Sequence, residues 1–101
     1  MIRTSLALAI FAATATASFA GPIESACLRS DRDAANPVLC GCIQNVANLV
    51  LSGGDQRRAA GFFSNPAKAQ DVRQSDRAAD EAFWRRYKEF GTVAETYCAA
   101  S

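Results

Sequence analysis

Four cysteines, Cys27, Cys40, Cys42 and Cys98, constrain the fold of this 101-residue chain more than any other feature. The chain has no histidine that could complete a mixed metal site, and a single residue, Gly41, separates the middle two cysteines. Zinc sites built from thiolates instead use two close pairs, each with two or more residues between the ligands. An even cysteine count in a small chain favours disulfides wherever the compartment is oxidising. We therefore predict two disulfides and no metal.

The first twenty residues have the order of a secretory signal peptide. Arg3 precedes the apolar run LALAIFAATATA, and Ser18 and Ala20 place small residues two apart at its end. The apolar run is shorter than the roughly 20 residues that a membrane-spanning helix needs. We predict cleavage after Ala20, a periplasmic or secreted location, and a single domain over residues 21–101 with no integral membrane segment.

The charge of the exported part argues against two classes of function. Without residues 1–20, the remaining 81 residues carry ten basic and ten acidic side chains, so their formal net charge is zero. Proteins that bind nucleic acid or disrupt membranes normally carry a basic excess. At this length a hydrophobic core alone supplies about 3–5 kcal/mol of net stability, so disulfides would contribute a large share.

Helix signals dominate the exported part, and no alternation of period two or hairpin dipeptide indicates a strand. Asparagine followed by proline at 36–37 and at 65–66, and Ser52 before Asp55, are typical of helix starts. We therefore predict an all-α bundle of four to five helices. The expected helices span residues 22–31, 37–51, 54–64, 66–74 and 75–98. Their expected buried residues include Ile23, Cys27, Leu28, Ala59, Phe62, Phe63 and Val72.

The pairing of the cysteines follows in part from helical phase. Apolar residues in the second helix recur at steps of four, three and four, which predicts one inward stripe. The stripe consists of Leu39, Ile43, Val46 and Val50.

Cys40 and Cys42 fall on opposite flanks of this stripe, and a bond between them would close a small strained ring. Each cysteine is therefore expected to pair elsewhere, one with Cys27 and the other with Cys98. We slightly favour Cys27 with Cys42 and Cys40 with Cys98, while the swapped pairing stays open.

The stretch FWRRYKEF at 83–90 mixes aromatic and basic residues, as nucleic-acid and membrane surfaces do. Helical phase instead separates it into two faces. The expected buried seam is Phe83, Tyr87, Phe90, Ala94 and Tyr97. The expected solvated ladder of alternating charge is Arg77, Glu81, Arg85 and Glu89, at about 0.2–0.5 kcal/mol per pair.

Trp84 and Arg86 lie on the two flanks of the seam, and both residue types are enriched at interface hot spots. We therefore select them as candidate partner contacts. Gly91, within the same predicted helix, is expected to clear space near the indole and to mark either close packing or a contact surface, because a helical glycine costs about 1 kcal/mol relative to alanine. Arg57 and Arg58 form a second basic pair, for which solvated surface is the expectation.

The phrases DQRRAAGFF at 55–63 and VRQSDRAADEAFWRRYKEFG at 72–91, joined to the cysteine pattern, resemble a family of short exported alphaproteobacterial proteins. The function of that family is not established, although its members are often labelled "arginine transporter". The resemblance covers the whole chain after residue 20 and carries no catalytic or binding residues. A transporter needs several membrane spans, so the resemblance implies at most a role accessory to arginine transport.

No catalytic constellation, phosphate loop or cofactor fingerprint is recognisable in the sequence. We therefore predict a non-enzymatic binding or structural protein without cofactor, which presents a helical surface to a protein or envelope partner. The alternative from another class is a thiol-disulfide oxidoreductase that uses Cys40 and Cys42.

Overall fold

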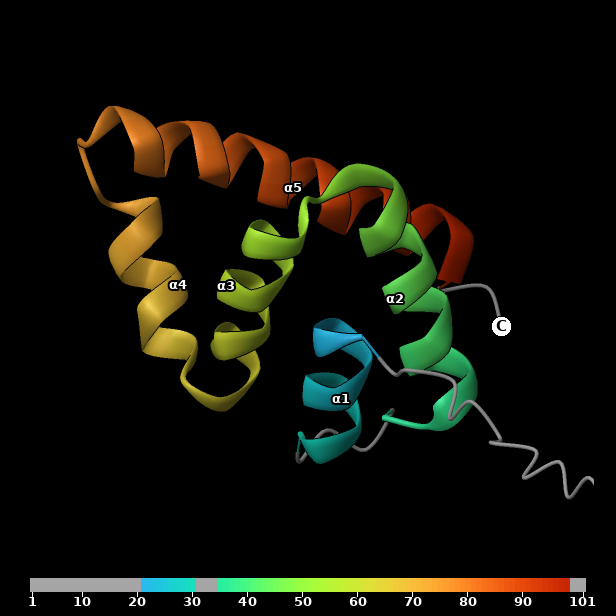
Figure 1. Ribbon diagram of the computed structural model, residues 1–101. Helices are drawn as coiled ribbons and strands as arrows, with labels where there is room; N and C mark the ends of the chain where they lie inside the picture. Colours follow the sequence, from blue (N-terminus) through green and yellow to red (C-terminus); the bar gives the residue numbers. More distant parts are fainter. Residues whose placement is uncertain (1–20, 31–34, 99–101) are drawn as a thin grey trace, which may run out of the picture.

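A computed structural model describes residues 21–30 and 35–98, and these form an all-α bundle with two disulfides, as predicted. The predicted signal peptide with its cleavage after Ala20, and residues 31–34, lie outside the described residues. The helices are α1 (Pro22–Arg29), α2 (Pro37–Val50), α3 (Gly53–Ser64), α4 (Pro66–Arg73) and α5 (Ala78–Cys98) (Figure 1).

The helix starts follow the caps in the sequence, with two exceptions. The side chain of Asn36 accepts a hydrogen bond from the backbone of Leu39 at 2.8 Å, and Ser52 caps α3 in the same way. Asn65 makes no side-chain cap on α4. Helix α5 begins three residues later than expected, because Ser75 accepts from the Arg77 amide and donates to Asp80 in the first turn.

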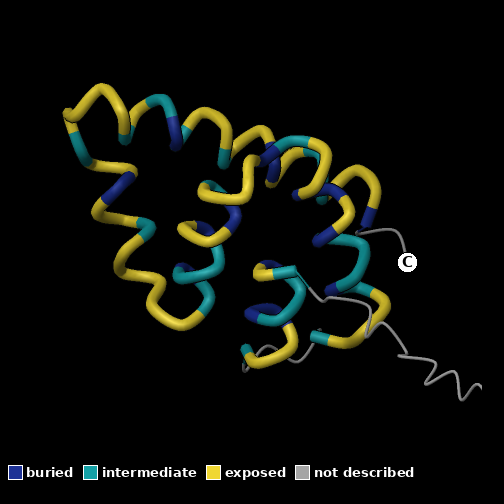
Figure 2. The backbone as a smooth tube through the Cα atoms, in the orientation of Figure 1, coloured by how far each residue is buried: buried dark blue, intermediate teal, exposed yellow. Residues whose placement is uncertain are grey.

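Helix α5 runs across α4, α3 and α2, and α1 packs against α2 and α3 (Figure 1). Figure 2 shows the buried positions on the sides where these helices meet, with the outer turns of α4 and α5 exposed. The Phe62 ring of α3 packs edge-on against Phe83 and Tyr87 of α5, with ring centroids 6.0 and 5.2 Å apart. Aromatic contacts of this kind add about 0.5–1.5 kcal/mol beyond buried area.

The seam on α5 is correct except at its last residue. Phe83 and Phe90 are buried and Tyr87 and Ala94 pack partly against the core, but Tyr97 is 73% exposed. Cys98 takes the buried position instead, because its disulfide draws that side of the last turn against α2. In α1 the prediction for Leu28 was also wrong: Leu28 is 44% exposed and Ala26 is buried.

The charge ladder along α5 does not form ion pairs within the part of the chain that the structure describes. The two ion pairs of that part instead join α3 to α5, each at 2.6 Å, as Arg58 with Asp80 and Arg86 with Asp55. The Arg58 guanidinium also lies 4.6 Å from the centroid of the Phe83 ring. The charged side chains therefore fix how α5 crosses α3.

A buried polar cluster joins α1, α2 and α3, and the apolar periodicity did not predict it. The amide of Gln44 donates to Gln56 at 2.7 Å and to Asn48 at 2.9 Å, and its oxygen accepts from the backbone of Glu24. Helix α1 starts at Gly21 without a side-chain cap, so Gln44 supplies that cap from α2. A Cβ at Gly21 would lie 2.5 Å from the end of the Gln44 side chain, so any other residue there would require Gln44 to move.

Candidate functional site

The cysteines pair as Cys27–Cys40 and Cys42–Cys98, so the favoured pairing was wrong and the swapped one is correct. Neither member of the C-x-C pair bonds to the other, as predicted, and the described residues contain no free cysteine. Cys27, Cys40 and Cys98 are buried, at 4%, 0% and 3% exposure, and only Cys42 is partly exposed.

The error has a simple physical reason. Helical phase places Cys40 and Cys42 on two flanks of α2, but it does not tell which flank meets α1 and which meets α5. In the structure α1 packs on the flank of Cys40, which also carries Gln44, and α5 closes over the flank of Cys42. The handedness of the bundle, which depends on contacts far apart in sequence, decides the pairing.

The two candidate contact residues lie on opposite sides of α5 and do not form one surface. Trp84 is half-buried, packs against the core and lies 5.2 Å from the Tyr87 ring. Arg86, two residues and about 200° further round the helix, donates two hydrogen bonds to the Asp55 carboxylate, at 2.6 and 3.1 Å. This pairing raises the pKa of Arg86. Trp84 therefore packs against the core, and Arg86 links α5 to α3 at the surface.

Gly91 does not clear space for the indole, because it is exposed and a Cβ there would meet nothing within 4 Å. The prediction of close packing at this glycine was wrong. Arg57 and Arg58 are both exposed, as expected, and Arg58 is in addition held by Asp80 and by the Phe83 ring.

One exposed face in the structure differs from all others in its chemistry. Helix α2 contains no charged residue, whereas each of the other four helices carries both acidic and basic side chains. After the exposed first residue, Pro37, the exposed residues of α2 are Val38, Asn45, Asn48 and Leu49, and we call these four the α2 face. Val38 and Leu49 are 73% and 82% exposed. They are eleven residues apart in the helix, so their side chains point within about 20° of the same direction.

Tyr97 extends this uncharged region toward α5. It precedes Cys98, whose Cα lies 5.8 Å from that of Cys42 on the same side of α2. The Cα atoms of Tyr97 and Cys42 are therefore within about 10 Å of each other. The sequence signal was present for Val38 and Leu49, two large apolar residues off the inward stripe of a helix without charges, but not for Tyr97, whose phase placed it on the buried seam.

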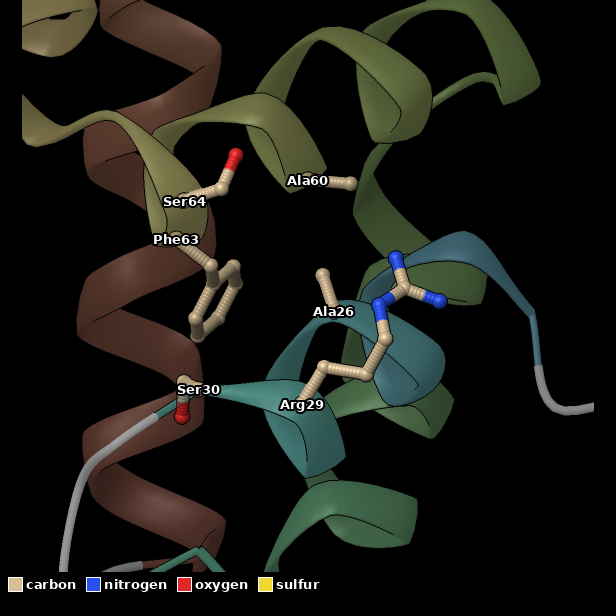
Figure 3. Close-up of a pocket in the computed structure, with 6 residues that line it drawn as sticks. All are labelled: Ala26, Arg29, Ser30, Ala60, Phe63 and Ser64. Carbon is tan, nitrogen blue, oxygen red and sulfur yellow. The ribbon is translucent and has the colours of Figure 1, made fainter.

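A small hollow of about 280 Å³ lies between α1 and α3 (Figure 3). Ala26 and the Phe63 ring face into it, and Arg29 extends along its edge (Figure 3). Arg29 is the last residue of α1, where the helix dipole is negative and offsets the attraction of one cation for an anion. The hollow therefore offers little charge selectivity.

The described residues contain no group of His, Cys, Asp or Glu side chains that could hold a metal ion. Among them, Asp80 is a carboxylate with a lowered pKa, because Arg58 and Ser75 donate hydrogen bonds to it and Arg58 adds its charge.

No described helix has the length and apolar character needed to cross a membrane. No family model, curated protein or solved structure matches the chain.

Proposed function

We propose that this protein is a non-enzymatic binding module that acts outside the cytoplasm and presents the α2 face to a protein partner. The observation that carries the proposal is the combination of exposed apolar side chains with a complete lack of charge on α2. The centre of a protein–protein interface is depleted of charged residues, whereas the remaining surface of a soluble protein is not.

The disulfides support a binding role for this helix. Both begin on α2, one at Cys40 toward α1 and one at Cys42 toward α5. A helix tied at two points loses little conformational freedom when a partner binds, and this lowers the entropic cost of association. The cross-links therefore serve both the stability of the bundle and the rigidity of the proposed contact surface.

The same cysteine geometry gives no support to the oxidoreductase alternative. A redox-active C-x-C would open and close between its own two sulfurs, whereas here Cys40 bonds to Cys27 in the buried interior. An accessory role in arginine transport fits the proposal only if the partner is a transporter subunit. Trp84 and Arg86 would then act as positioning residues that hold α5, and Leu49 and Val38 as contact residues.

The test is photo-crosslinking in a periplasmic extract with a benzophenone amino acid at Asn45. We expect one discrete adduct that disappears when Leu49→Glu places a charge on the α2 face. Ala67→Glu, at an exposed position on α4, is the matched control and should leave the adduct unchanged. Equal adducts with Leu49→Glu and with wild type would refute the proposal.

Self-association is a separate outcome of the same surface. If the partner is a second copy, light scattering of the purified protein will show a dimer that Leu49→Glu converts to a monomer. That result would replace a foreign partner by self-association and would contradict the proposal as stated.

A further inference from the structure

A second hollow, of about 390 Å³, lies between α3 and α4, away from the α2 face. Its volume is at the low end of the range of ligand pockets, about 300–1,000 Å³, and suits a small ligand. The residues that line it are Arg57, Arg58, Gly61, Phe62, Lys68, Asp71 and Val72. We call this site the α3–α4 hollow.

The floor of the α3–α4 hollow is apolar and its entrance is open. Phe62 and Val72 are 6% and 8% exposed, so both are held firmly by the core. Gly61 contributes no side chain, and a Cβ built on it would meet nothing within 4 Å. An apolar group can therefore lie beside Phe62 without displacing any part of the protein.

The rim of the α3–α4 hollow is basic. Three cations, Arg57, Arg58 and Lys68, and one carboxylate, Asp71, line it, and because Asp80 neutralises Arg58 the net formal charge of this region is +1. Arg57 and Lys68 form no ion pair with the described residues, whereas Arg58 is fixed in place by Asp80 and the Phe83 ring. For a chain whose total formal charge is only +1, this is a local concentration of positive charge that attracts anions.

We infer that the α3–α4 hollow binds a small carboxylate with an aromatic or branched apolar body. The carboxylate pairs with Lys68 at the rim, and the apolar body covers Phe62 and Val72. A cationic ligand such as free arginine is disfavoured there by the same charges. The site is independent of the α2 face, so its test does not depend on the proposed protein partner.

The experiment is an NMR titration of the disulfide-bonded protein with phenylacetate at low ionic strength. We expect amide shifts centred on Gly61, Phe62 and Val72, with a dissociation constant on the order of a few millimolar for so small a ligand. Lys68→Gln should weaken binding by about threefold to fivefold, as expected for an exposed ion pair. Lys88→Gln on α5 removes an equivalent exposed charge elsewhere and should leave binding unchanged.

Gly61→Leu tests the shape of the site without changing its charge. Leucine is a better helix former than glycine, so the variant should fold, while its side chain fills the hollow and abolishes the shifts. Unchanged binding in this variant would overturn the inference. The inference would also be overturned if inorganic phosphate bound as tightly as phenylacetate, because charge alone would then explain the binding, or if arginine bound more tightly than either.

Discussion

Removal of the Cys42–Cys98 disulfide should destabilise the protein more than removal of Cys27–Cys40. In the chain-entropy model, a cross-link restricts the unfolded chain according to the length of the loop that it closes. The sequence separations are 56 for Cys42–Cys98 and 13 for Cys27–Cys40. These lengths give about 4 and about 3 kcal/mol, respectively, at 25 °C. For a domain of this size, a loss of 4 kcal/mol lowers the melting temperature by roughly 15–30 °C.

The measurement is urea unfolding of the double variants Cys42→Ala with Cys98→Ala and Cys27→Ala with Cys40→Ala, followed by circular dichroism. The midpoint alone is ambiguous, because Cys27 and Cys40 are both buried and their truncation also leaves a cavity. The m-value separates the two effects, since it reports how far the unfolded chain expands. The variant without Cys42–Cys98 should therefore show the larger rise in m. An equal or larger rise in the other variant would refute the reasoning.

The pairing itself can be checked by thiol counts in the same set of proteins. Tryptic mapping cannot separate the two pairings, because only Gly41 lies between Cys40 and Cys42. The variant with Cys27→Ala and Cys40→Ala should contain no free thiol, whereas the variant with Cys27→Ala and Cys42→Ala should expose two. The opposite result would show that the favoured sequence-based pairing had been correct.

Three further predictions concern single sites. Gly91→Ala should raise the free energy of unfolding by about 0.5–1 kcal/mol, because the exposed helical position has room for a methyl group; a loss in thermal melts would mean that something contacts this glycine. Gln44→Ala should cost about 2 kcal/mol or more, since Gln56 and the Glu24 amide lose a buried partner; a change below 0.5 kcal/mol in urea unfolding would contradict the role of the buried cluster. The pKa of Asp80 is lowered below its ordinary value of 3.8. Its contribution to stability is therefore fully present above pH 3.8 and is lost as the pH falls through the lowered pKa. Asp80→Asn should lower the urea midpoint at pH 7 and have a smaller effect at pH 2, and an effect independent of pH would exclude the ion pair as its cause.

The helices could be predicted because their signals are local. Asn36, Pro37 and Ser52 determine helix starts through contacts within four residues, and apolar spacing identifies the inward positions of Phe83 and Phe90. Prediction from local spacing fails at Tyr97. Its phase on α5 is that of a buried residue, but the disulfide turns Cys98 toward α2 and leaves Tyr97 exposed, and only the three-dimensional arrangement shows which of the two faces α2.

The roles of Arg86 and Gln44 were harder to predict because they depend on which helices are neighbours. Arg86 was selected for its residue type, yet its role became clear only once Asp55, 31 residues away in sequence, lay beside it. Gln44 gave a weaker signal: a polar residue in phase with the buried Cys40 and Ala47. A polar residue in such a position must have a partner, but the sequence does not name Gln56 as that partner.

The distribution of charge over the bundle connects the scaffold to its proposed use. The two ion pairs join α3 to α5, and both disulfides join α2 to its neighbours. Covalent bonds therefore tie α2 to its neighbours as ion pairs tie α3 to α5, and α2 itself carries no charged residue. A helix fixed by salt bridges would have to display charged residues beside its exposed face, and these would oppose burial against an apolar partner. The use of disulfides at α2 is thus the arrangement expected if that face is to be covered by another protein.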